Sequence, residues 1–223
     1  MTKLNSWSLS QIHGIETEPI TWPDEFSSNS RGSISLTAEA IHLTHLGELR
    51  LVNIISPKIC IINLFFYPQD ASELPVYAME YVRFGPKAVV GVVDMKWLPE
   101  HRTPTWIANT MTAVSLEVGD LPRGQEMPKW YEECRSGNDF FLRPENEDDL
   151  DRSVMCHQLT WLAFLKKLSH GATRVTNNEP EICSKLVSQY KDHHRINSPG
   201  LPFLNRTFGK PWTDTFLSEF YFK

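Results

Sequence analysis

The stretch that decides the fold is Leu74-Pro75-Val76-Tyr77-Ala78-Met79-Glu80-Tyr81-Val82-Arg83-Phe84-Gly85. Apolar side chains recur at every second position in it, and this period predicts a β-strand. Successive strand side chains point to opposite faces of a sheet, so one face carries Val76, Ala78, Glu80, Val82 and Phe84. Because four of these five residues are apolar, we expect that face to be buried.

Glu80 is the exception on that face. A buried carboxylate without a partner is strongly disfavoured, so it must find a donor or keep its proton with a raised pKa. A carboxylic acid that stays protonated near neutral pH can give a proton to a substrate. Glu80 is therefore the first candidate for a catalytic residue.

Two more polar residues interrupt neighbouring apolar strands. Asn63 shares a face with Ile61 and Phe65, where its amide must be hydrogen-bonded. Asp94 lies near the end of its strand, where it could instead cap a turn. A single such residue is most often structural, whereas two on adjacent strands favour a polar site, and the sequence leaves both interpretations open.

The flanking sequence predicts an α+β fold in a single domain over residues 1–223, with an irregular segment at 1–30. Short turns imply antiparallel pairing, because parallel strands need a long crossover. The expected strands are 33–43, 49–56, 59–67, 76–84, 88–98 and 139–143. The expected helices are 104–118, 127–135, 147–169, 181–194, 201–207 and 211–221, and they should pack on the sheet.

Composition narrows the class of protein. The net charge of −5 leaves no basic footprint for nucleic acid. Residues 185–223, however, hold six Lys or Arg against three Asp or Glu, which favours either docking of an acidic partner or a solvated surface. The four cysteines show no metal-binding spacing and are expected to be reduced structural thiols.

The longest nearly apolar run, 59–67, is too short to span a bilayer, and the N-terminus does not resemble a signal or transit peptide. We therefore expect a soluble, cytoplasmic protein. Phosphate-loop, GxGxxG, GxSxG and HExxH motifs are absent from the sequence. A redox reaction would then need its electrons from outside.

Three blocks resemble the ferredoxin-dependent bilin reductases. The first contains Tyr67-Pro68, the stretch from Leu74 to Glu80, and Val93-Asp94; the second is Phe140-Phe141-Leu142-Arg143-Pro144. The third and most specific is Phe208-Gly209-Lys210-Pro211-Trp212-Thr213-Asp214-Thr215-Phe216-Leu217-Ser218-Glu219-Phe220-Tyr221-Phe222. The blocks follow in order over roughly residues 50–223.

The resemblance implies a three-layer α/β/α sandwich around a central antiparallel sheet. It implies biliverdin IXα or dihydrobiliverdin as substrate, between the sheet and the C-terminal helices. It also implies no bound metal or organic cofactor, with reduced ferredoxin as the external electron donor and the protein as proton source.

The resemblance also assigns residues. The family's catalytic Asp falls on Glu80, its neighbouring Asn or His falls on Asn63, and a propionate-binding Arg falls on Arg143, whose fork suits a carboxylate. Asn63 is typical of the phycoerythrobilin-type branch. The family commonly has an Asp before the proline that corresponds to Pro199, for a second proton transfer; Ser198 occupies that place here, and a serine hydroxyl cannot replace that acid directly. Asn197 and Ser198 are both expected to bind the substrate.

We therefore expect proton-coupled reduction of biliverdin by single electrons from ferredoxin, to 15,16-dihydrobiliverdin or onward to phycoerythrobilin. Glu80 replaces the usual Asp, and distant relatives that reduce red chlorophyll catabolite resemble the chain in having Glu there. A reductase of another open-chain tetrapyrrole and a non-catalytic bilin carrier are the alternatives. The second acid could be replaced by His193, His194 or water.

Overall fold

The computed structural model describes residues 8, 9, 12, 14–69, 74–85, 87–98, 103–124, 126–170 and 180–223, without the side chains of 87–89 and 180–183. Its centre is one antiparallel sheet in the order β1-β3-β4-β5-β6-β7-β8, with β2 paired to β3. The strands are β1 (Thr17–Pro19), β2 (Ser28–Arg31), β3 (Ile34–Leu43), β4 (Gly47–Ser56), β5 (Ile59–Pro68), β6 (Val76–Phe84), β7 (Lys87–Lys96) and β8 (Asp139–Leu142).

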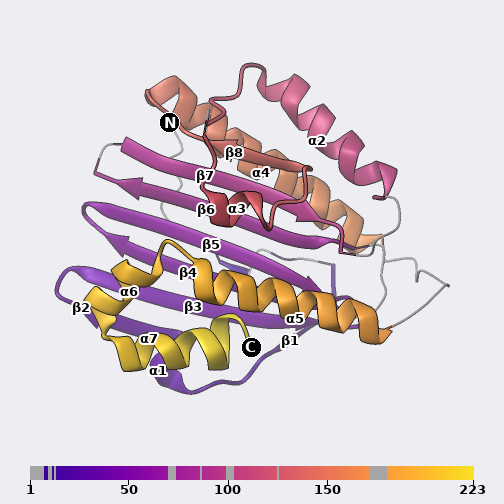
Figure 1. Ribbon diagram of the computed structural model, residues 1–223. Helices are drawn as coiled ribbons and strands as arrows, with labels where there is room; N and C mark the ends of the chain where they lie inside the picture. The colour runs from indigo at the N-terminus through magenta and orange to yellow at the C-terminus, as the bar shows by residue number, and fades with distance from the viewer. Residues whose placement is uncertain are drawn as a thin grey trace.

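Helices cover both faces of this sheet. They are α1 (Asp24–Ser27), α2 (Thr105–Val118), α3 (Lys129–Glu132), α4 (Glu147–Ser169), α5 (Pro180–Asn197), α6 (Leu201–Phe208), α7 (Lys210–Phe216) and a π-helical turn, Leu217–Tyr221. Figure 1 shows α2 and α4 on one face and α5, α6 and α7 on the other. The predicted α+β fold with three α/β/α layers is confirmed.

Alternation along the strands divides the apolar side chains between two cores. On β5, Ile62, Leu64 and Phe66 pack in the core beneath α2 and α4. Ile61, Phe65 and Tyr67 face the opposite way, into the core beneath the C-terminal helices. Since Val76 and Ala78 of β6 belong to this second core, the face that carries Glu80 is buried as the periodicity predicts.

The predicted elements differ from the structure mainly at their ends. The segment 1–30, expected to be irregular, contains β1, α1 and the start of β2, and this expectation was wrong. The helix expected at 211–221 is divided, because α7 ends at Phe216 and a π-helical turn follows. The helix expected at 127–135 shortens to α3, where Pro128 precedes the first turn.

Helix α4 begins and ends where its sequence predicts. Asn146 caps its N-terminus by accepting a hydrogen bond at 2.9 Å from the backbone N–H of Asp149. The first turn carries Glu147, Asp148 and Asp149 and the last carries Lys166 and Lys167, which complement the helix dipole. This stable element holds His157, which contacts the strand that carries Glu80.

None of the helices in the described part of the chain is both long and apolar enough to cross a membrane. Cys60, Cys134 and Cys156 are buried thiols that form no disulfide among the described residues, as expected, and the side chain of Cys183 lies outside those residues.

His157 connects α4 to the sheet. Its Nε2 lies 3.1 Å from the backbone carbonyl oxygen of Glu80, and its Nδ1 lies 2.6 Å from that of Ser153. The side chain is fully buried. It fits only because residue 91 on β7 is glycine, since a Cβ there would lie 2.8 Å from His157 Cε1.

We therefore expect Gly91→Ala to reduce the free energy of unfolding by about 1–3 kcal/mol, because the ring of His157 must move to avoid an overpacked contact. Urea denaturation measures this change. Gly200→Ala is the matched control, because its Cβ meets its nearest neighbour, Ser198 Oγ, at an ordinary 3.5 Å. Equal losses in the two variants would contradict the packing role of Gly91.

Candidate active site

The register between β5 and β6 places Asn63 directly opposite Glu80. Both side chains point toward the C-terminal helices, because they alternate with the residues packed beneath α4. In the amide orientation that satisfies both atoms, Asn63 Nδ2 donates to Glu80 Oε1 at 3.3 Å and to the carbonyl of Ile62 at 3.1 Å. The two residues that the sequence singled out separately thus form one hydrogen-bonded pair.

Among the described residues, no cation offsets the burial of Glu80. Desolvation raises the pKa of its carboxyl to about 7, and no opposing cause lowers it. The amide of Asn63 is a neutral donor, so it orients the carboxyl without forcing it to ionise. Glu80 is consequently able to hold a proton near neutral pH, as expected from its place on an apolar face.

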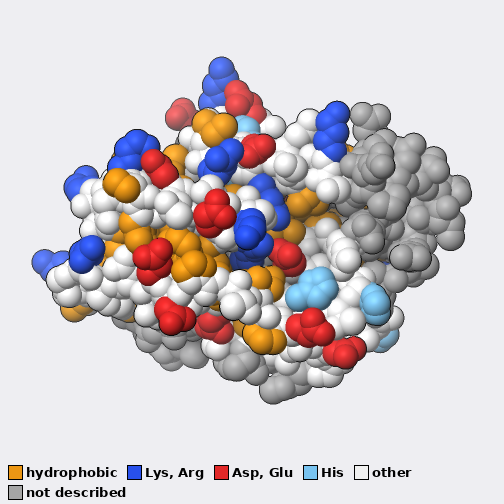
Figure 2. All heavy atoms as spheres, turned by 90° about the horizontal axis from the view of Figure 1, so that it is seen from below, with side chains coloured by type: hydrophobic (Ala, Val, Ile, Leu, Met, Phe, Trp, Pro, Cys, Tyr) orange, Lys and Arg blue, Asp and Glu red, His pale blue; other side chains and the backbone are white. Residues whose placement is uncertain are grey.

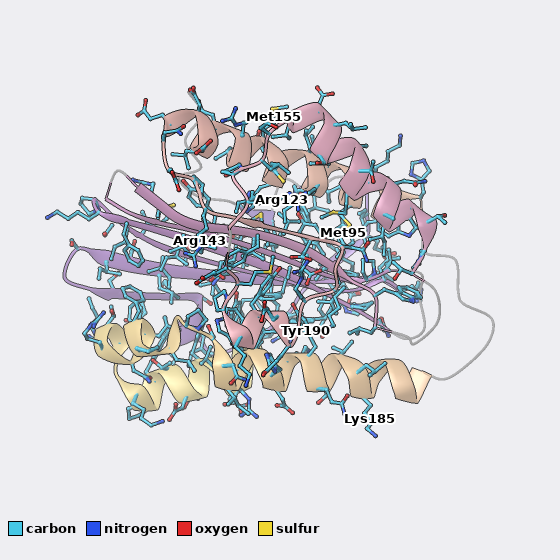
Figure 3. All side chains as sticks on the ribbon, turned by 45° about the horizontal axis from the view of Figure 1, so that its top comes forward. Met95, Arg123, Arg143, Met155, Lys185 and Tyr190 are labelled. Carbon is cyan, nitrogen blue, oxygen red and sulfur yellow. The ribbon has the colours of Figure 1, made fainter. Side chains whose placement is uncertain are left out.

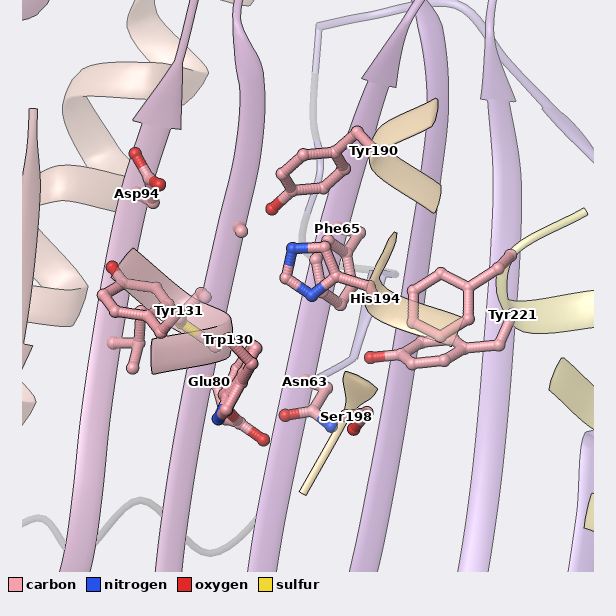
Figure 4. A pocket seen from close by; sticks show the side chains of 14 residues that line it. Asn63, Phe65, Glu80, Asp94, Trp130, Tyr131, Tyr190, His194, Ser198 and Tyr221 are labelled. Carbon is pink, nitrogen blue, oxygen red and sulfur yellow. The ribbon is translucent and has the colours of Figure 1, made fainter. Parts of the chain in front are cut away.

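A pocket opens over this pair, with an empty volume of about 500 Å³ that includes its part open to solvent. Its floor is formed by β5, β6 and β7, and its roof by α3, α5 and the C-terminal segment (Figure 4). The aromatic and histidine side chains that line it are Phe65, Trp130, Tyr131, Tyr190, His194, Tyr221 and Phe222. Such flat apolar walls around a few polar groups are typical of a site for a conjugated organic ligand.

His194 is the histidine that faces this pocket. It is 8% exposed, its ring lies 4.3 Å from that of Tyr190, and its Nε2 has no hydrogen-bond partner among the described residues. Burial, aided by the neighbouring His193 and Lys96, lowers the pKa of His194 to about 3. The neutral ring therefore offers a ligand one donor and one acceptor but is not a proton reservoir.

His193, by contrast, is engaged in the protein's own structure. Its Nε2 donates to the backbone carbonyl oxygen of Trp130 at 2.8 Å, which connects α5 to α3. It is not among the residues that line the pocket.

Asp94 is the second carboxyl on the pocket wall. It is 2% exposed and accepts hydrogen bonds from the backbone N–H of Ser136, at 3.1 Å, and from the Ser136 hydroxyl. Burial raises the pKa of Asp94 to about 7 despite those bonds. Asp94 does not cap a turn at the end of its own strand, as the sequence suggested it could; it lines the pocket and holds Ser136, in the turn before β8.

Arg143 follows β8 at the far edge of the sheet. Its guanidinium lies over the ring of Phe141 at 5.0 Å, and Phe141 packs 5.2 Å from Tyr131, which lines the pocket. Arg143 itself lines a second, more open hollow together with Arg123, Glu126, Glu145 and Asp149. Figure 3 shows Arg123 and Arg143 beside each other near β8, and Tyr190 pointing toward the sheet from α5.

Asn197 and Ser198 separate at the end of α5. Ser198 lines the pocket and lies next to Asn63 in Figure 4. Asn197 is exposed, and its Nδ2 donates to the backbone carbonyl oxygen of His193 at 3.0 Å. The structure therefore brings Glu80, Asn63 and Ser198 together and leaves Asn197 and Arg143 outside the pocket lining.

Sequence reasoning missed Tyr190, Trp130 and His157. Tyr190 and His194 are four residues apart on α5, and this spacing puts them on one helical face. The sequence alone therefore indicates that these two side chains lie together. His157 and Trp130 gave none, since only the packing of α4 and α3 on the sheet brings them to β6 and α5.

A metal site is not apparent in this part of the chain. Among the described residues, no three His, Cys, Asp or Glu side chains are arranged to hold a metal ion.

Comparison with known proteins gives a family match over nearly the whole chain. Residues 8–223 match the model of a family described as ferredoxin-dependent bilin reductase. A phycocyanobilin:ferredoxin oxidoreductase of Prochlorococcus marinus (strain MIT 9515) is 23% identical over 75% of this chain and 68% of its own length. A phycoerythrobilin:ferredoxin oxidoreductase of Synechococcus sp. (strain WH8020) is 21% identical over 96% of this chain and 90% of its own length.

The fold has a solved counterpart. The crystal structure of phytochromobilin synthase from tomato, in complex with biliverdin, superposes with a TM-score of 0.73. It covers 96% of this chain and 79% of its own, at 15% sequence identity. The similarity establishes the shared fold.

The raised pKa of Glu80 predicts a pH dependence of stability. Between pH 4.5, the ordinary pKa of Glu80, and about pH 7, its carboxyl binds more protons in the folded protein than in the unfolded chain. The stabilisation that Glu80 contributes is therefore complete below this window and is lost as the pH rises through it. We expect the unfolding free energy of the wild type, relative to Glu80→Gln, to fall by at most on the order of 3 kcal/mol. Urea denaturation of both proteins at pH 4.5 to 8 measures it, and a flat difference would contradict the raised pKa.

Proposed function

The chain belongs to the ferredoxin-dependent bilin reductase family, and we propose that it reduces biliverdin IXα with single electrons from reduced ferredoxin. The observation that carries this proposal is a proton-holding carboxyl, Glu80, paired with Asn63 on the floor of an aromatic pocket. A flat conjugated bilin matches those walls in shape and polarity.

Glu80 is proposed as a proton donor to the bound bilin. Each two-electron reduction adds two electrons and two protons, and ferredoxin supplies only the electrons. Uptake of an electron makes the bilin more basic, and a nearby acid with a pKa near 7 is well matched to protonate it. Asn63 keeps the carboxyl aimed at the pocket, and its side-chain carbonyl oxygen can accept hydrogen bonds from the pyrrole N–H groups of the bilin.

The walls position the substrate. The unpartnered Nε2 of buried His194 and the hydroxyl of Ser198 face the same pocket and can bind polar edges of the bilin. Arg143, held over Phe141, is proposed to bind a propionate where the bilin leaves the pocket toward β8. The aromatic rings exclude water and so protect radical intermediates from stray protonation.

Ferredoxin is proposed to approach the side of the C-terminal helices, where Lys and Arg outnumber Asp and Glu. Figure 2 shows that the two signs are interspersed on this face. Lys210 pairs with Asp214 at 2.6 Å and Arg195 with Asp192 at 2.8 Å, so two of the six basic residues are neutralised locally. The remaining excess is modest, which favours a weak, transient complex.

The product proposed is 15,16-dihydrobiliverdin, or phycoerythrobilin if a second reduction follows. Asn63 supports this choice, because it is the residue that the sequence resemblance associates with the phycoerythrobilin-type branch. Ser198, in place of an acid on the pocket wall, supports a single reduction.

The test is to mix the protein with biliverdin IXα and a reducing system for ferredoxin under anaerobic conditions, and to separate the products by chromatography. We expect a blue-shifted product that co-elutes with 15,16-dihydrobiliverdin. A spectral shift without turnover would instead identify a carrier. Absence of binding would remove biliverdin as substrate, and another open-chain tetrapyrrole such as red chlorophyll catabolite would be tried next.

Glu80→Gln should bind biliverdin normally but reduce it about 10²–10⁴-fold more slowly, with a bilin radical accumulating, because the amide holds the same hydrogen bonds without an acidic proton. Stopped-flow absorbance and electron paramagnetic resonance measure both effects. Glu39→Gln is the matched control, because Glu39 is a partly buried carboxylate of the same sheet that instead accepts from the backbone N–H of Leu9 at 3.1 Å. Wild-type turnover in Glu80→Gln would exclude the donor role.

A further inference from the structure

We infer that Asp94 is the second proton donor to the bound bilin, acting from β7 while Glu80 acts from β6. This inference rests on the proposed function. It concerns the proton that Glu80 cannot supply within a single two-electron reduction, and that Ser198 is too weak an acid to give.

Geometry places the two carboxyls within reach of one ligand. Val92 is the partner of Glu80 across β6 and β7, and Asp94 is the partner of Ala78. Asp94 is thus the diagonal neighbour of Glu80 on the same sheet face, a relation that separates two residues by about 7–8 Å and their Cβ atoms by somewhat less. Both side chains line the same pocket, so a planar molecule lying on the sheet can contact both.

The groups around Asp94 suit an acid that alternates between its protonated form and its carboxylate. Burial and the nearby Asp139 favour the protonated form, whereas Lys96 and the two hydrogen bonds from Ser136 favour the carboxylate. Asp139 is itself held by Arg135 at 2.8 Å and by the hydroxyl of Tyr131 at 3.1 Å. When Asp94 gives up its proton, the donors of Ser136 are already in place to stabilise the charge.

The other candidates are weaker donors. Buried His194 is neutral near pH 7, because its pKa lies near 3, so it carries no acidic proton to give. His193 already donates its Nε2 proton to the carbonyl oxygen of Trp130 and lies outside the pocket lining. Tyr190 and Tyr131 face the pocket, but burial raises the pKa of each phenol well above its ordinary value.

Two reduced ferredoxins of the one-electron iron–sulfur class each lose an electron, and the bilin gains both. Glu80 supplies the first proton. The O–H bond of Asp94 then breaks as a bond to hydrogen forms on the singly protonated bilin, leaving Asp94 as a carboxylate hydrogen-bonded to Ser136 and later reprotonated from solvent.

Single-turnover kinetics of Asp94→Asn test this role. The amide can keep the contacts with Ser136 but has no acidic proton. We expect normal biliverdin binding, normal formation of the first radical and its decay slowed by about 10²-fold or more. The double variant with Glu80→Gln should accumulate the species seen in Glu80→Gln alone, since the Glu80 proton comes first.

Ser136→Ala tests whether Asp94 donates a proton or only holds the turn before β8 through its hydrogen bonds with Ser136. It removes one hydrogen bond that lowers the pKa of Asp94, so that pKa rises. Decay of the first radical isolates the second proton transfer from the Glu80 step, and the alkaline limb of its rate–pH profile should move to higher pH. If Asp94 only holds that turn, Ser136→Ala and Asp94→Asn should lose turnover and stability to the same extent. If Asp94→Asn does not fold, the rate–pH profile of Ser136→Ala alone tests the inference, and a profile that does not shift overturns it.

Two further outcomes distinguish a failure of this inference from a failure of the proposed function. Wild-type radical decay in Asp94→Asn, in an enzyme that turns over, overturns the role of Asp94 and leaves the proposed function intact. A wild-type protein that neither binds nor reduces biliverdin overturns both.

Discussion

The site depends on the pairing register of β5 with β6. Strand side chains alternate between faces, so a slip of one residue would turn Glu80 into the core beneath α4 and bring an apolar residue into the pocket. The register is held on both sides, by Ile62, Leu64 and Phe66 in one core and by Ile61 and Phe65 in the other. The acid is therefore positioned by apolar packing in two layers and not by a charged partner.

Much of this arrangement was predictable from sequence. The period of two identified the five long strands and the buried face of Glu80, because alternation records burial directly. The short elements β1, α1 and β2 were not predicted, since polar segments that add to a sheet edge lack that signal. The π-helical turn at the end of α7 was also missed, because it depends on how Phe216, Phe220 and Tyr221 pack beneath the sheet.

The site was predictable only as separate residues. Asn63 and Glu80 stood out because each interrupts an apolar face, but their pairing depends on register. Asp94 remained ambiguous because the residue that it holds, Ser136, is 42 positions away. His157 gave no signal at all, since a histidine on an amphipathic helix becomes informative only when Gly91 opens a space for it against the sheet.

One sheet face therefore carries two carboxyls, Glu80 and Asp94, and burial raises the pKa of each to about 7. The groups that surround the two carboxyls differ. Glu80 has a neutral amide beside it, and in the proposed reaction its proton would pass to the bilin once the bilin becomes the stronger base. Asp94 has donors and a nearby lysine that stabilise its anion and partly offset its burial. In the proposed reaction the two acids would respond to electrons that arrive one at a time, Glu80 first and Asp94 second. If Asp94 acts as inferred, β6 and β7 together supply two protons for one reduction, although Ser198 at the end of α5 is not an acid.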